Sequence, residues 1–415
     1  MDRIIEQDIL NHKADRAVDG SLRKLWSFSL FVFLVCHIAF SSQNYLLILN
    51  TYALYFFLGV SFLCIFVSGE IKFNLFLATM VVFQLVLLIG DIYSTSPEMM
   101  HYTYSYFVSM CIVFCMVNYI REDKDIKFIF KGIMVGGFAL NIYIISLYGS
   151  AFIDVIMSQT RVGEVAGNAN DIGIKSCISA FFALYFLVKE KQKKLVKIMH
   201  IVICFVCFFF ALITASKQVV ILLVVGLFYL FMIHDNKNPL VYIRNASVFL
   251  ILLIVAVLLI YNVKYFEYLK TRIDEFVALL LHGGGSESDA KRMRFLSEGI
   301  SVFLQKPIFG DGTAASYNYF STYSHSNLVE ILMNHGFLGF IVYYFPYPLA
   351  VYRCIQKKKS KYDTMKLSTL CLFVFISLIV LSFTLVHYNI IYYQLLIAVS
   401  ATFGFKSKDD DSVVS

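Results

Sequence analysis

The chain has 415 residues, of which 59% are hydrophobic and 15% are charged, and its mean hydropathy is +0.73. Soluble domains carry roughly 45–50% apolar and about 25% charged residues, so this composition excludes a soluble globular enzyme. The formal net charge of +7 would indicate a nucleic-acid partner only if the cations were gathered together, so their distribution decides its meaning.

Apolar runs long enough to cross a bilayer occupy most of the chain after a polar N-terminal segment. A helix satisfies its own backbone hydrogen bonds in lipid, so each run is predicted to be a transmembrane helix. The sequence therefore predicts an all-α polytopic membrane protein with about twelve spans. These spans are residues 25–41, 45–68, 73–91, 104–120, 131–149, 171–188, 198–214, 218–234, 246–263, 326–352, 366–386 and 389–405.

Two long segments separate spans on the same side of the predicted bundle, at residues 150–170 and 264–325. The second is predicted to contain an apolar interfacial helix around Phe276 to Leu281 and a flexible, glycine-rich joint at 283–286. An amphipathic helix from Lys291 to Leu304 follows the joint. The predicted organisation is an N-terminal segment at 1–24, one transmembrane domain at 25–405 with the long loop 264–325, and a tail at 406–415.

The distribution of lysine and arginine predicts the orientation. If the N-terminus is cytoplasmic, 25 of the 35 cations fall in cytoplasmic segments, as the positive-inside rule requires. Both termini are then cytoplasmic and the two long segments face outward. Most of the positive charge is explained by topology, and no nucleic-acid partner is expected.

Three of the outward cations lie at or within the predicted membrane boundary. Arg161 precedes a turn-rich stretch, Lys217 lies in a very tight hairpin that begins at Thr214, and Lys175 lies one turn into a span after Asp171. Ionisable groups at such depth usually face the protein interior or a wet cavity. Snorkelling, lipid-headgroup contact and an Asp171–Lys175 helical pair are the structural alternatives.

Two further outward cations belong to the amphipathic helix. Arg292 and Arg294 cannot share a helix face, because positions two apart diverge by about 200°. One of them is expected to turn inward, where a guanidinium can bind phosphate oxygens in a bidentate manner. A solvated basic face is the alternative explanation.

A histidine marks the outer end of a predicted span. His325 precedes Ser326 and Asn327, either of which can cap the helix that follows. A histidine at this border can act as a general base near neutral pH, although a structural or capping role is common for such a residue.

These residues resemble the bacterial O-antigen polymerase and O-antigen ligase superfamily. His325 with Ser326, followed by Gly336 and Gly339, is similar to the histidine motif of that superfamily. The stretch 292–312 also resembles it, with an arginine, an amphipathic helix and a Phe-Gly-x-Gly turn. Arg161 before a Gly-Asn-Ala-Asn turn and Lys217 in the hairpin are similar to its two other basic positions, with lysine replacing arginine at 217.

The resemblance implies a fold similar to glycosyltransferase class C and donors that are undecaprenyl-diphosphate-linked oligosaccharides. It implies that His325 and Arg292 are catalytic and that Arg161, Lys217, Arg294 and Lys175 bind the diphosphate. It also implies an active site at the outer face of the cytoplasmic membrane, with membrane lipids, a chain-length regulator and a flippase as partners. No metal or other cofactor is expected, because Asp-x-Asp strings occur only at 123–125 and 409–411, on the cytoplasmic side.

Three functions stay open at this point. A polymerase joins repeat units to one another, and a ligase transfers the glycan to lipid A core; we favour the polymerase because that branch is more diverse. About twelve spans also suit a transporter of lipid-linked oligosaccharides. A transporter should show related halves and polar groups near the bilayer midplane, whereas this chain concentrates its unusual charges at the outer boundary.

Overall fold

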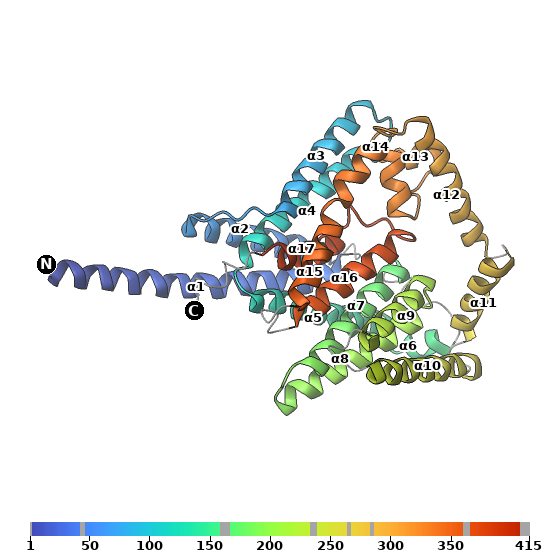
Figure 1. Cartoon of the computed structure of the whole chain (residues 1–415), viewed down its shortest axis with the longest axis horizontal. Helices are drawn as coiled ribbons and strands as arrows, with labels where there is room; N and C mark the ends of the chain where they lie inside the picture. Colours follow the sequence, from blue (N-terminus) through green and yellow to red (C-terminus); the bar gives the residue numbers. More distant parts are fainter. Residues whose placement is uncertain are drawn as a thin grey trace.

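The structure, a computed structural model, describes residues 2–41, 46–157, 167–232, 239–263, 267–282, 286–359 and 366–406. Within these residues every regular element is helical (Figure 1). The helices are α1 (Asp2–Phe40), α2 (Leu47–Ser68), α3 (Leu75–Tyr93), α4 (Met99–Tyr119), α5 (Asp123–Tyr148), α6 (Ala151–Met157), α7 (Ala169–Lys189), α8 (Lys194–Ile213), α9 (Lys217–Met232), α10 (Pro239–Asn262), α11 (Glu267–His282), α12 (Glu287–Gln305), α13 (Ser316–Phe320), α14 (Asn327–Tyr344), α15 (Pro346–Lys359), α16 (Leu367–Ser382) and α17 (Ile391–Phe405).

The predicted spans are confirmed as helices. Eight helical segments of the described chain are long and apolar enough to cross a membrane. Four shorter apolar helices, within α9, α10, α16 and α17, occupy the positions of the remaining predicted spans. The chain is therefore an all-α polytopic membrane protein.

The interior of the bundle is built on α7, α16 and α17. Most residues of α7 are buried, because α5, α8 and α9 all pack against this helix. Nearly every residue of α17 is buried as well, between α4, α15 and α16. Helices that are apolar on all sides are stable only in such central positions.

The tenth predicted span is interrupted in a way that the sequence analysis did not anticipate. Residues 326–352 are predicted as one helix, but Gly336 has φ 62° and ψ −161° and breaks α14 in its middle. The turn at 307–312 fills this break and takes up the freed backbone groups. Its hydrogen bonds are Asp311 N to Met333 O at 2.9 Å, Gly312 N to Asn334 O at 2.9 Å, and Phe337 N to Pro307 O at 2.8 Å.

Gly336 should not tolerate a side chain. A Cβ atom there would lie 2.4 Å from the carbonyl oxygen of Ile308, and the positive φ would add backbone strain. We expect Gly336→Ala to lower the free energy of unfolding by at least about 2 kcal/mol. The matched control is Gly59→Ala on α2, where an added Cβ would meet nothing within 4 Å. Thermal unfolding of the purified protein in detergent measures both, and equal midpoints would contradict the interpretation.

Helices α11 and α12 form a column along one edge of the bundle, at the right of Figure 1, while α1 projects from the opposite side. The predicted amphipathic helix is confirmed as α12. It begins at Glu287, earlier than expected, because Ser286 and Asp289 form a capping box at its N-terminus. α12 packs against α14, and α11 contacts α9 and α10. Residues 283–285 and the predicted tail after Lys406 lie outside the described residues.

Candidate functional site

His325 lies in a tightly fixed connection before α14. Its backbone has φ 63°, a left-handed conformation that is uncommon for a residue with a side chain. Ser326 caps the helix, as predicted, by accepting a hydrogen bond from the backbone N–H of Val329. The fully buried Glu330 accepts hydrogen bonds from the Ser316 hydroxyl at 2.6 Å and the Ser324 N–H at 2.7 Å. These hydrogen bonds fix the backbone on both sides of His325.

Aromatic packing places Arg292 on the face of α12 that lies next to His325. Phe295 stacks on Phe320 with ring centroids 4.3 Å apart, and its ring is parallel to that of His325 at 6.0 Å. Arg292 lies three residues before Phe295 and so shares its helix face. Its Nε is buried and has no hydrogen-bond partner among the described residues. Burial lowers the pKa of Arg292, yet a guanidinium stays charged at neutral pH.

Lys217, the first residue of α9, reaches the site from the hairpin predicted at Thr214. Its ammonium forms ion pairs with Asp289 at 2.5 Å and Glu275 at 3.1 Å, and only 7% of its side chain is exposed. Burial disfavours the charged form of Asp289, but the hydrogen bonds from Lys217 and Ser286 outweigh it and lower the pKa of this carboxyl. Lys217 is thus held by one carboxylate of α11 and one of α12.

These three side chains line one cavity of about 160 Å³. Lys217, Arg292 and His325 contribute to its wall, together with Asp289 and the segment around Thr384. Three residues that are far apart in the sequence therefore meet at one end of the bundle. The cavity combines a guanidinium with an unpaired Nε, an ion-paired ammonium and an imidazole.

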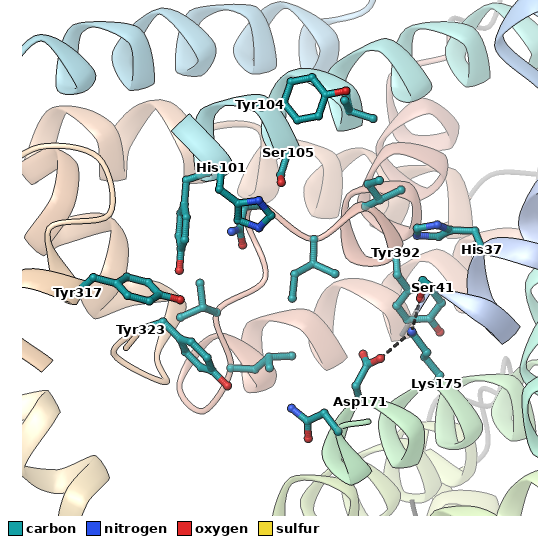
Figure 2. Close-up of a pocket in the computed structure, with 18 residues that line it drawn as sticks. His37, Ser41, His101, Tyr104, Ser105, Asp171, Lys175, Tyr317, Tyr323 and Tyr392 are labelled. Atoms are coloured by element: carbon teal, nitrogen blue, oxygen red, sulfur yellow. Dashed lines mark hydrogen bonds and ion pairs between the residues drawn. The ribbon is translucent and has the colours of Figure 1, made fainter. Parts of the chain in front are cut away.

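A second and larger cavity, of about 510 Å³, adjoins the first. Figure 2 shows tyrosine side chains around it, from α4, α13 and the loop after α13. Tyr323 belongs to its wall, and the Tyr323 ring lies 4.4 Å from the His325 ring, so His325 stands between the two cavities. Its tyrosines are Tyr102, Tyr104, Tyr317, Tyr323 and Tyr392.

Lys175 lies in the second cavity, away from Arg292. Its ammonium forms an ion pair with Asp171 at 2.6 Å and a hydrogen bond with Ser41 at 3.3 Å (Figure 2). The charge of Lys175 is therefore balanced locally by the helical pair that the sequence suggested as an alternative. The structure does not group this residue with the other predicted diphosphate ligands.

A further predicted ligand, Arg294, does not line the cavity that Arg292 lines. The Arg294 side chain is 63% exposed and pairs with Glu298 on its own helix at 2.9 Å. It points away from Arg292 because residues two apart on a helix diverge. Arg161 lies outside the described residues.

Burial and nearby positive charges together set the protonation state of His325. Burial, followed by the nearby charges of Arg292 and Lys291, lowers the pKa of His325 from 6.5 to about 4. At neutral pH the imidazole is therefore uncharged and able to accept a proton.

A comparison with known families found a match to part of the chain. The family described as O-antigen ligase matches residues 202–344, which include Lys217, Arg292 and His325. This match over residues 202–344 supports the resemblance to the O-antigen polymerase and ligase superfamily. No curated protein matches the chain.

This family match supports an O-antigen polymerase or ligase activity in general and, with the apolar helices, an integral membrane location. It does not separate polymerase from ligase, and the transporter alternative gains no support from it.

The sequence analysis missed the acidic residues that organise this site. Asp289 and Glu275 hold Lys217, and Glu330 fixes the His325 connection. Asp289 carries one signal in the sequence, since Ser286-x-x-Asp289 has the spacing of a capping box. Nothing in the spacing of Glu275 or Glu330 predicts their partners.

Proposed function

We propose that this protein is a surface-polysaccharide polymerase. In this proposal it joins undecaprenyl-diphosphate-linked repeat units at the outer face of the cytoplasmic membrane and releases undecaprenyl diphosphate. The observation that supports it is the cavity in which Arg292, Lys217 and His325 converge. A ligase that transfers the glycan to lipid A core is the second candidate, favoured by the description of the matching family.

The proposed reaction is a displacement at the anomeric carbon of the donor sugar. The acceptor hydroxyl oxygen forms a bond to that carbon, and the bond from the carbon to the diphosphate oxygen breaks. Its electron pair stays on the diphosphate, and the hydroxyl proton passes to the His325 imidazole. The main electrostatic demand is the negative charge that develops on the leaving diphosphate.

Arg292 is proposed to meet that demand. Its guanidinium offers donors in a planar fork, and its buried Nε has no competing partner among the described residues. Lys217 is less available, because a phosphate oxygen must replace Asp289 or Glu275 before it contacts the ammonium. We therefore assign the first diphosphate contact to Arg292. Lys175 and Arg161 remain predictions as diphosphate ligands, supported only by the resemblance, whereas Arg294 is exposed, does not line the cavity and is not proposed as a ligand.

The tyrosine-lined cavity beside His325 suits the acceptor sugar. Tyrosine offers an apolar ring face together with a hydroxyl that can form hydrogen bonds, which matches the mixed surface of a sugar. The Asp171–Lys175 pair leaves the cavity without a large net charge. An acceptor held there would lie beside Tyr323, whose ring is 4.4 Å from that of His325.

The remaining parts of the proposal concern orientation, metal and partners. Because most lysine and arginine residues lie in the predicted cytoplasmic segments, we place both termini in the cytoplasm and the site outside. Side-chain cations supply the positive charge that a divalent metal would provide, so the reaction is proposed to be metal-independent. A chain-length regulator and a flippase remain predicted partners.

A reconstituted assay with purified lipid-linked repeat units tests the proposal. A polymerase should produce a lipid-linked ladder from these units alone, and the ladder should persist in chelator. A product that forms only after lipid A core is added would identify the ligase instead. Restoration of activity by magnesium after chelation would overturn the metal-independent mechanism.

The charge of Lys291 offers a test of the proposed base. Lys291 lies over the Phe295 ring at 5.5 Å and contributes to the low pKa of His325. Activity that requires neutral His325 should be present above about pH 4 and lost as pH falls through that value. Lys291→Gln should raise this pKa and move the acid limb of kcat/KM to higher pH, since kcat/KM reports the free enzyme. An unchanged limb would argue against His325 as the base.

A further inference from the structure

A third cavity, of about 540 Å³, lies at the end of the bundle opposite to the candidate site. It is bounded by the loop before α3, the end of α4, α15 and the end of α17. Helix α3 begins at this cavity and ends near the candidate site, so about 28 Å of helix separates the two. The lining residues are Lys72, Phe73, Asn74, Leu75, Val117, Ile120, Arg121, Leu349, Arg353, Thr402, Phe405 and Lys406.

The charge of this cavity is one-sided. Four of its lining residues are lysine or arginine, and none is aspartate or glutamate. Lys406 forms an ion pair with Asp123 at 3.4 Å. Within the described residues, the side chains of Lys72, Arg121 and Arg353 form no ion pair with a carboxylate.

Several other cations at the same end of the bundle form ion pairs with acidic side chains. Arg23 pairs with Asp125 at 2.7 Å, and Lys131 pairs with Glu190 at 3.0 Å. Lys127 also pairs with Glu190. The positive-inside rule explains why cations gather at this end, but it does not explain why Lys72, Arg121 and Arg353 form no ion pair within the described residues while Arg23, Lys127 and Lys131 do.

Hydrogen bonds fix the loop that contributes Lys72. The backbone N–H of Lys72 donates to Asn118 Oδ1 at 2.6 Å, and Asn118 Nδ2 donates to the Lys72 carbonyl at 3.2 Å. Asn74 caps α3 and donates to the Thr402 hydroxyl at 3.0 Å. The wall of the cavity is therefore built by contacts between elements that are remote in sequence.

The apolar part of the wall faces outward. Phe73 is 60% exposed, Leu75 is 38% exposed and Leu349 is 37% exposed. A cavity that joins several cations to exposed apolar side chains at the end of membrane spans matches the two parts of a lipid, a phosphate-bearing head and acyl chains.

We propose that this cavity binds the phosphate headgroup of an anionic membrane phospholipid. Lys72, Arg121 and Arg353 contact the phosphate, and Phe73, Leu75 and Leu349 contact the first carbons of the acyl chains. The site is separate from the one proposed for catalysis and does not depend on its function.

The test compares two lipids with the same acyl chains on the full-length protein purified in detergent. Binding of phosphatidylglycerol and phosphatidylcholine is measured by native mass spectrometry and by the shift in unfolding temperature. Phosphatidylglycerol should bind at least about tenfold more tightly, because several cations face the headgroup. The double variant Lys72→Gln/Arg353→Gln should weaken that binding by about fivefold for each cation removed. The matched control, Lys194→Gln/Lys197→Gln, removes two exposed cations of α8 that do not line the cavity.

Three results would overturn the proposal. The first is equal binding of the two lipids, and the second is an equal loss in the cavity variant and the control. The third is displacement of phosphatidylglycerol by inorganic phosphate at the same concentration, which would identify a free-anion site and exclude the lipid. Unfolding temperatures without added lipid confirm that both double variants are folded.

Discussion

Replacing Arg292 by alanine is expected to lower kcat/KM for chain elongation by about 10³-fold, the effect of removing a principal donor to a developing negative charge. Arg292 lines the small cavity beside His325, and its buried Nε has no partner among the described residues. Its neighbour Lys217 cannot replace it, because Asp289 and Glu275 already neutralise that ammonium. The measurement is the initial rate of polymer formation from lipid-linked repeat units.

Two further variants separate charge from geometry. Arg292→Lys keeps the charge but loses the planar fork, so it should recover only part of the lost rate. Arg294→Ala is the matched control on the same helix, and it should stay within about twofold of wild type because its exposed side chain pairs with Glu298 and does not line the cavity. Equal losses in Arg292→Ala and Arg294→Ala would indicate a general basic surface and would contradict the assignment.

The helices of this protein could be predicted from the sequence, because lipid leaves a backbone few other choices. Long apolar runs mark the spans, and 3.6-residue periodicity marks the amphipathic α12. The same periodicity predicted that Arg292 and Arg294 would diverge, although it could not tell which one would face inward. That choice was made by Phe295, whose ring packs between Phe320 and His325.

The break in α14 and the partners of the cations could not be predicted in this way. Gly336 adopts a positive φ only because the turn at 307–312 supplies hydrogen bonds to the interrupted helix. Lys217 and Lys175 both looked like phosphate ligands, since each is a cation at the outer boundary. Their carboxylate partners differ in origin: Asp171 lies one turn away, whereas Asp289 is 72 residues distant. Only tertiary packing reveals a partner of the second kind.

His325→Asn is expected to lower kcat by about 10²–10⁴-fold, the usual contribution of a general base. Asparagine is the informative replacement because it tolerates the left-handed backbone that His325 adopts at φ 63°, whereas alanine would add strain there. It retains hydrogen-bonding atoms but cannot take up a proton at neutral pH. Loss of rate with an unchanged unfolding temperature would therefore report on proton transfer.

The pH profile distinguishes this role from a merely structural one. In the free protein, burial and the nearby charges of Arg292 and Lys291 lower the pKa of His325 to about 4. A bound diphosphate would offset these positive charges and raise the pKa toward neutrality, where a base is most effective. The acid limb of kcat in the wild type should then lie at higher pH than the limb of kcat/KM, since kcat reports the substrate complex. His325→Asn should lose both limbs, and a residual activity that still falls at the same pH would assign the base to another group.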